Sequence, residues 1–193
     1  MKAILIFGPP GAGKGTQGIL IGKKKGYFHI STGDIFRYVE HHGEIGKKVK
    51  KYLEKRELVP DSLAMKLFDA ELKRLVENKA FDSLKDIIIL DGMPRDRKQV
   101  REVNKRFDVV QIILLHFEKE GALINRILKR AKKEKREDDQ DMAVIKHGID
   151  VYHKKTEEIL REYPKSIILR VDGSGSIAQI HKEIMKGIFR ASS

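Results

Sequence analysis

The sequence GPPGAGKGT at residues 8–16 decides the fold, and it directly follows the apolar run AILIF at residues 3–7. A short strand that leads into a glycine-rich turn and then into Gly-Lys is the pattern of a phosphate-binding loop. Glycines let successive N–H groups point at one anion, and a helix expected to begin near Lys14 adds the positive end of its dipole. Lys14 supplies a mobile charge for the outer phosphates, and Thr16 supplies a hydroxyl for a metal ion. A turn without a ligand is the alternative, which the register of glycines, lysine and threonine disfavours.

The composition suits a soluble protein of one domain. The chain has 193 residues and a net charge of +12, from 40 basic and 28 acidic side chains. Such a charge can indicate nucleic-acid binding, but the lysine clusters are not interleaved with aromatic residues, so we interpret them as a solvated surface. The chain has no cysteine, which excludes disulfides and thiolate metal sites. With neither a signal-peptide pattern nor a membrane-length apolar run, we expect a cytoplasmic monomer without membrane or nucleic-acid partners.

Apolar runs of strand length alternate with helical patterns along the chain. They are nearly continuous in Ile, Leu and Val, which is typical of parallel strands buried on both faces. The expected strands are residues 3–7, 27–30, 87–90, 109–117 and 167–171. Helical spacing follows Asp61, a candidate N-cap, and recurs over 142–160 and 177–188. The pattern predicts an α/β fold of three layers, with a five-stranded parallel sheet flanked by helices, as in P-loop NTPases.

We expect one domain over residues 1–193, with a core of 1–30, 61–130 and 142–193. Two stretches interrupt the alternation of strands and helices. Residues 31–60 have helical segments without a strand, and residues 131–141 are almost free of apolar side chains. Both are interpreted as inserts at the edge of the core, where moving parts of enzymes are often found.

A second polar cluster follows two of the other expected strands. The sequence STGD at residues 31–34 opens a helix, and Arg37 lies one turn into it, within reach of an anion at the start of that helix. Asp91 ends a buried strand and is a candidate for holding Mg²⁺ through water. Arg95 and Gln99 are one helical turn apart and could face the same ligand. For the STGD residues and for Asp91, a plain helix cap is the alternative interpretation.

These motifs together resemble the adenylate kinases, a family of nucleoside monophosphate kinases. Gly15 stands where most phosphate-binding loops have Ser or Thr, as is usual in that family. The other matching motifs are STGD with Arg37, LDGMPR at 90–95 with Gln99, and REDD at 136–139. They occur in the family's order and cover nearly the whole chain.

The resemblance implies a role for each matching residue. Residues implied to bind ATP are Gly11, Ala12, Gly13, Lys14, Gly15, Thr16, Arg126, Arg130 and Gly173. Residues implied to bind AMP are Thr32, Gly33, Arg37, Val59, Gly92, Arg95, Gln99 and Arg136. Asp91 and Thr16 would hold Mg²⁺ through water, and the catalytic residues would be Lys14, Arg95, Arg130 and Arg136.

The resemblance also implies a short lid over residues 131–141 and a nucleoside-monophosphate-binding insert over 31–60. Asp138 and Asp139 would orient the lid arginines when the lid closes. The short lid has no room for the strand-bearing module of long-lid relatives, so no structural zinc is expected. The family usually has a further arginine at a position where this chain offers Lys146, His147 or no replacement.

The implied activity is a reversible Mg²⁺-dependent phosphoryl transfer from ATP to AMP that gives two ADP, in nucleotide homeostasis and AMP salvage. The partners would be ATP, AMP and ADP. Thr32 and Gln99 favour AMP as the acceptor, because relatives of the uridylate–cytidylate type usually have other residues there. A kinase for UMP, CMP or another monophosphate is the nearer alternative. A nucleic-acid-binding factor gated by a nucleoside triphosphate is the more distant one, suggested by the charge alone.

Overall fold

Five parallel strands form the central sheet, in the order β2-β3-β1-β4-β5. The computed structural model describes residues 1–39, 42–54, 59–118, 121, 123–128 and 142–189. The strands are β1 (Lys2–Phe7), β2 (Tyr27–Ser31), β3 (Ile87–Asp91), β4 (Asp108–His116) and β5 (Ile168–Asp172). The predicted fold class and all five strands are confirmed. Ile167 differs from its prediction, since it belongs to a short 3₁₀ helix, Lys165–Ile167, before β5.

The sheet has a core on each face because its central strands are apolar at nearly every position. Side chains alternate along a strand, so successive residues of β1 enter different clusters. Leu5 packs into one core with Leu90 and Phe68, whereas Ile4 and Ile6 pack into the other. The near-continuous apolar runs therefore result from burial on both faces.

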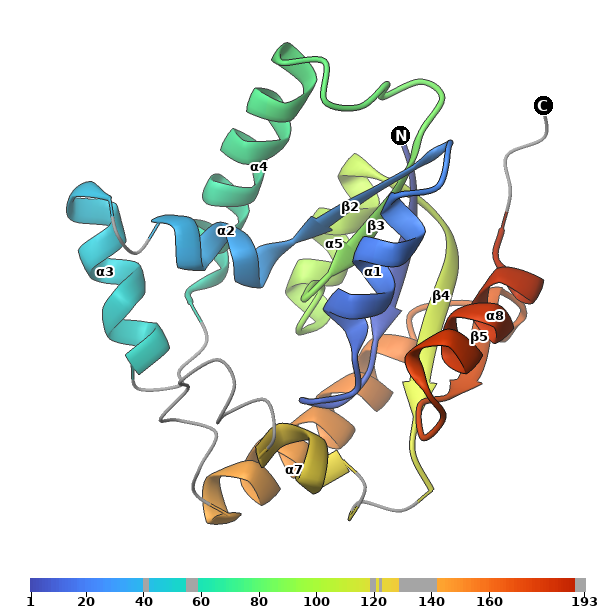
Figure 1. Cartoon of the computed structure of the whole chain (residues 1–193). Coiled ribbons are helices and arrows are strands. Elements are labelled where there is room, and N and C mark those ends of the chain that lie inside the picture. Colours follow the sequence, from blue (N-terminus) through green and yellow to red (C-terminus); the bar gives the residue numbers. More distant parts are fainter. Residues whose placement is uncertain (40–41, 55–58, 119–120, 122, 129–141, 190–193) are drawn as a thin grey trace.

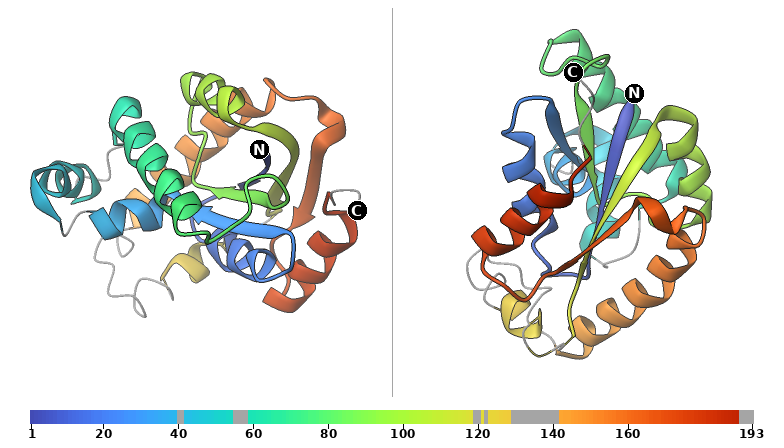
Figure 2. Two further views of the ribbon diagram at one scale, coloured as in Figure 1. Left: turned by 90° about the horizontal axis from the view of Figure 1, so that it is seen from above. Right: turned by 90° about the vertical axis from the view of Figure 1, so that its right-hand side faces the viewer.

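Helices cover both faces of the sheet (Figures 1 and 2). Packed on one face are α1 (Lys14–Gly22) and α8 (Ile177–Gly187). The other face carries α4 (Asp61–Glu77), α5 (Arg97–Arg106) and the carboxyl-terminal part of α7 (Met142–Leu160). Two further helices, α2 (Thr32–Val39) and α3 (Gly43–Glu54), lie to one side of the sheet, beside α4 (Figure 1).

One expectation and one alternative interpretation about helix starts need correction. Pro60 is the N-cap of α4, and Asp61 is the first helical residue rather than the cap. Asp91 is not a helix cap but the last residue of β3. The cap of α5 is Asp96, whose carboxylate accepts hydrogen bonds from the backbone N–H groups of Lys98 and Gln99. Asp91 therefore caps no helix, and its carboxylate lies 3.9 Å from Nε2 of His29.

The parallel order places the loop after β1 beside the end of β3. Ile6 pairs in register with Asp91, so the segment that begins at Gly8 and the turn at Gly92 leave the sheet at the same edge. Ligands of open α/β sheets bind in the crevice outside the carboxyl ends of the strands. In the part of the chain described above, no helix has the length and apolar character to cross a membrane.

Candidate active site

The loop after β1 leaves the amino end of helix α1 without a side-chain cap. Gly13 is the N-cap residue in a left-handed conformation, and no side chain caps the helix. The first N–H groups of α1 therefore keep their capacity to bind an anion. The Lys14 ammonium lies back on the loop, where it donates hydrogen bonds to the carbonyl oxygens of Gly8 at 2.7 Å and Pro9 at 3.2 Å.

Gly11 lies where the loop packs against the helical segment 123–128. Its φ of 79° lies in the region that favours glycine. A Cβ added at Gly11 would also lie 2.5 Å from Cγ1 of Ile127, in the helical segment 123–128. The loop therefore packs closely against this segment, which precedes in the sequence the residues expected to form the lid.

Asp91 and the turn that follows it form the next part of the site. The Asp91 side chain is 11% exposed, and one of its carboxylate oxygens would lie 3.4 Å from a Cβ added at Gly15 in the first turn of α1. Gly92 has a φ of 90°, and a Cβ there would collide with the Thr32 hydroxyl. That hydroxyl donates a hydrogen bond to the Asp91 carbonyl oxygen at 3.3 Å. Thr32 thus fastens the start of α2 to the end of β3.

The donor chemistry around Asp91 fits Mg²⁺. This ion prefers oxygen ligands, keeps several waters, and is usually held by one or two carboxylates together with substrate phosphates. Asp91 supplies one carboxylate next to α1, and Thr16, in the first turn of that helix, is exposed and supplies a hydroxyl. Within the described ranges no cluster of three or more His, Cys, Asp or Glu side chains could hold a metal.

Arg95 and Gln99 are joined in one network behind this turn. The Arg95 Nε donates to the Gly92 carbonyl oxygen at 2.8 Å. The Gln99 amide oxygen accepts a hydrogen bond from the Arg95 backbone N–H at 2.9 Å, and its amide nitrogen donates to Asp61 at 2.5 Å. Burial lowers the pKa of the Arg95 guanidinium, and the Asp91 charge opposes that shift. A half-buried guanidinium of this kind is suited to bind a phosphate.

The remaining acceptor residues lie on or beside α2. Arg37 makes an ion pair with Asp34 of the same helix, and its guanidinium folds back over Gly33, where an added Cβ would lie 3.4 Å from Nη1. Ser31 contributes the cap-like contact that the sequence left open, because its hydroxyl accepts the Asp34 N–H at 3.3 Å. Val59 is buried and packs in the apolar core on this side of the sheet.

Arg126 and Gly173, which were predicted on the ATP side, lie together. The Arg126 guanidinium donates to the carbonyl oxygens of Gly173 at 2.6 Å, Ser174 at 3.0 Å and Gly175 at 2.7 Å. It also lies over the Phe117 ring, 5.4 Å from the centroid. Phe117 in turn packs so closely on Gly173 that a Cβ there would collide with the ring. These contacts anchor Arg126 on the turn at residues 173–175.

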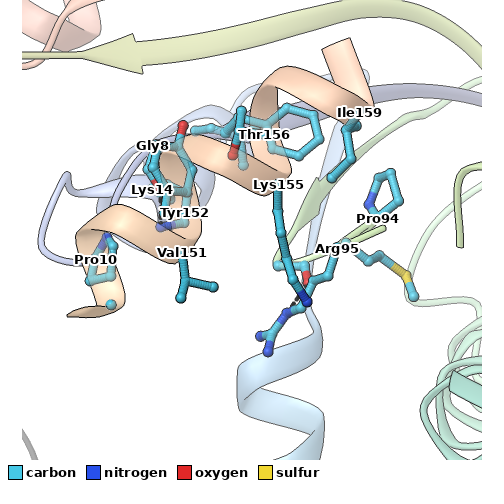
Figure 3. A pocket seen from close by; sticks show the side chains of 15 residues that line it. Gly8, Pro10, Lys14, Pro94, Arg95, Val151, Tyr152, Lys155, Thr156 and Ile159 are labelled. Carbon is cyan, nitrogen blue, oxygen red and sulfur yellow. Dashed lines mark hydrogen bonds between the residues drawn. The ribbon is translucent and has the colours of Figure 1, made fainter. Parts of the chain in front are cut away.

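One cavity connects the loop, the turn after β3 and helix α7. It has a volume of about 290 Å³, and Lys14, Arg95 and Lys155 are the cationic side chains in its wall (Figure 3). Burial raises the pKa of Tyr152, also in the wall, to about 12, so its hydroxyl stays protonated at neutral pH. The wall is otherwise largely apolar, and its three cationic side chains favour an anion in this space.

Some predicted site residues fall in the part of the chain that the structure does not describe, and some residues of the site were not predicted. Arg130, Arg136, Asp138 and Asp139 lie outside the described residues. Sequence reasoning missed Asp61 as the partner of Gln99, Phe117 as the support of Arg126, and Lys155. Lys155 is one of several lysines in α7. The only sequence signal for it is its spacing of seven residues from Gly148, which places both residues on one face of the helix.

Comparison with known proteins agrees with this geometry over nearly the whole chain. The family model described as adenylate kinase matches residues 6–168. The adenylate kinase of Pseudarthrobacter chlorophenolicus is 36% identical over 199 residues, covering 100% of both chains. That of Kocuria rhizophila is 36% identical over 196 residues, covering 98% of this chain and 100% of the relative. That of Thermus thermophilus is 33% identical over 190 residues, covering 95% of both.

These matches confirm the resemblance drawn from the motifs and make the protein a phosphotransferase that binds nucleotides. The phosphate-binding loop and the residues that line the cavity all lie within the matched residues. The chain belongs to the adenylate kinase family.

Proposed function

We propose that this chain transfers the terminal phosphoryl group of Mg²⁺-bound ATP to AMP and gives two ADP in a reversible reaction. The observation that carries the proposal is the shared cavity, in which Lys14 from the phosphate loop and Arg95 from the turn after β3 line one space. Phosphoryl transfer in this class depends mainly on positioning and on neutralising charge, so two anion-binding groups on one space are the required arrangement.

On the donor side, the uncapped start of α1 and the residues from Gly11 to Thr16 bind the phosphates of ATP. Lys14 exchanges its contacts with the loop carbonyls for the outer phosphates. Arg126 and the turn at Gly173 form a platform beside the adenine. Mg²⁺, held through water by Asp91 and Thr16, neutralises charge on the phosphate oxygens when it is bound.

On the acceptor side, Arg37 and Arg95 bind the phosphate of AMP. Thr32, Gly33, Val59, Gly92 and Gln99 surround the rest of the nucleotide. The Gln99 amide is hydrogen-bonded to Arg95 and Asp61, which supports a fixed orientation of its side chain for reading the base.

The segment 31–60 and the lid at 131–141 close over the two nucleotides and exclude water, which would otherwise hydrolyse ATP. Arg130 and Arg136 bring charge to the phosphoryl group, and Asp138 and Asp139 orient them. We expect lid opening to limit turnover.

A coupled assay of ADP formation from ATP and AMP, with and without Mg²⁺, tests the proposal. We expect ADP to form only when both nucleotides and the metal are present. Parallel assays with CMP, UMP and GMP test the acceptor, and AMP is expected to give the highest kcat/KM. A higher kcat/KM with another monophosphate would show that AMP is not the preferred acceptor. Absence of ADP formation would overturn the proposed reaction. Salt-sensitive RNA binding without turnover would instead favour the nucleic-acid-binding alternative.

A further inference from the structure

One face of helix α7 forms a wall of the cavity. Six of its residues line the space at helical spacing, and these are Gly148, Val151, Tyr152, Lys155, Thr156 and Ile159. Residues three, four and seven apart lie on one face of a helix. Lys155 is the charged member of this set and follows Gly148 by two turns.

The Lys155 side chain leaves α7 and extends toward Arg95 across the cavity (Figure 3). Lys155 is half-buried, and it makes no ion pair or hydrogen bond with any residue that the structure describes. None of the described residues that line the cavity is acidic. A cation removed from part of its water without a carboxylate partner is unfavourable, and a second cation facing it adds repulsion. An anion between Lys155 and Arg95 would relieve both effects.

Other positive side chains of α7 do not share this position. Lys146 and His147, the candidates that the sequence offered for a missing arginine, are exposed and do not line the cavity. Gly148, the next residue, does line it, and a Cβ there would approach only Pro10, at 3.9 Å. Lys154 is adjacent to Lys155 but exposed and outside the cavity.

We propose that Lys155 binds the phosphoryl group during its transfer, as a third cation opposite Lys14 and Arg95. This inference rests on the proposed function. A phosphate oxygen of AMP forms a bond to the terminal phosphorus of ATP while the bond to the bridging oxygen breaks, and that oxygen leaves with the electron pair as part of ADP. The Lys155 ammonium donates hydrogen bonds to oxygens of the transferring group and keeps its proton. Because charge shifts among these oxygens during transfer, Lys155 contributes more to the transition state than to binding.

Four variants compared with the wild type test this role. Lys155→Met and Lys155→Gln remove the charge, Lys155→Arg keeps it, and Lys154→Met makes the matched change on the exposed neighbour. We expect the two neutral variants to lower kcat roughly 100-fold, the scale of one lost transition-state donor, with KM values changing much less. Lys155→Arg should retain far more activity than either, and Lys154→Met should match the wild type.

Binding of diadenosine pentaphosphate, measured by calorimetry, provides a readout that does not need turnover. We expect Lys155→Met to weaken this binding about tenfold, the effect of losing roughly one charge-assisted hydrogen bond, and Lys154→Met to leave it unchanged. Thermal unfolding of Lys154→Met should match the wild type, and that of Lys155→Met should occur at the same or a slightly higher temperature, because an unfavourably placed cation is removed.

Wild-type kcat and unaltered binding in Lys155→Met would overturn the inference, as would equal losses in Lys154→Met. A loss of kcat matched by a fall in thermal stability, and not recovered in Lys155→Arg, would assign Lys155 a packing role instead. If the wild type itself forms no ADP, the proposed function fails, whereas the binding measurement still decides whether Lys155 contacts phosphate.

Discussion

The phosphate loop and the acceptor cluster differ in how the chain assembles them. Residues 8–16 are consecutive, and one strand and one helix hold them. The acceptor cluster is built from Thr32 of α2, Asp61 of α4, Gly92 and Arg95 of the turn after β3, and Gln99 of α5. Substitutions in a local motif can change catalysis without changing the free energy of unfolding. Substitutions in a cluster that joins several elements are expected to change both.

Replacing Lys14 by Met is the most severe expected change to activity. It removes the ammonium that binds the outer phosphates, and we expect kcat/KM to fall at least about 100- to 1,000-fold in the coupled assay. Lys14 donates hydrogen bonds to the nearby loop carbonyl oxygens of Gly8 and Pro9, so its loss is mainly local and the free energy of unfolding in urea should change by less than about 1 kcal/mol.

Lys25→Met is the matched control, because Lys25 is exposed in the turn before β2. It should retain wild-type turnover. Retained activity in Lys14→Met would show that the donor phosphates bind elsewhere, and unfolding of that variant would show that the loop is not energetically separate from the fold.

Replacing Gly92 by Ala should damage stability as well as activity. The φ of 90° makes a side chain unfavourable by about 1–3 kcal/mol. The new Cβ would also collide with the Thr32 hydroxyl, and overpacking of this kind costs a further 1–3 kcal/mol or so. Urea denaturation measures the sum, and the KM for AMP should rise because Thr32 and Arg95 are displaced.

Gly26→Ala separates the two effects. Gly26 has a φ of 86°, but a Cβ added there would meet no atom within 4 Å. This variant should lose only the backbone component of stability and keep its turnover. Equal losses in the two variants would mean that the contact between Gly92 and Thr32 contributes nothing.

The sequence predicted the contiguous parts of the protein well. The five strands and helix α7 were located to within about one residue, because near-continuous apolar runs and helical spacing are local properties. Asp61 shows that local sequence patterns do not predict contacts between distant residues. A residue after Pro60 has the local pattern of a cap, but the carboxylate instead meets Gln99, 38 positions away, and only the packing of α4 on α5 determines that contact.

The candidate site follows the same division. The motifs identified Lys14, Asp91, Arg95 and Gln99, which the structure brings to one edge of the sheet or to the adjoining cavity. Lys155 was not predicted, because α7 contains several lysines and only the helix face on which Lys155 lies distinguishes it from the others. That face depends on how α7 packs against the sheet, and a single sequence does not encode the packing in a local motif.

Replacing Gln99 by Ala tests whether the acceptor cluster reads the base. We expect the KM for AMP to rise about tenfold and the KM for ATP to change little, because the cluster lies on the acceptor side. Asp61→Ala should raise the KM for AMP in the same direction by a smaller factor, since it frees the Gln99 amide without removing it. Equal changes for both nucleotides in Gln99→Ala would argue against a base-reading role.

The smallest expected effect comes from Arg126→Lys on the donor side. The planar guanidinium contacts three carbonyl oxygens of one turn and the Phe117 ring together, and an ammonium cannot reproduce that fork. Losing about 1 kcal/mol of this anchoring should raise the KM for ATP roughly fivefold and leave the KM for AMP unchanged. Arg101→Lys, on the exposed side of α5, is the control and should match the wild type. Because Arg126 contacts a turn rather than the phosphate loop, a larger loss than in Lys14→Met would show that this platform, and not the loop, dominates the binding of ATP.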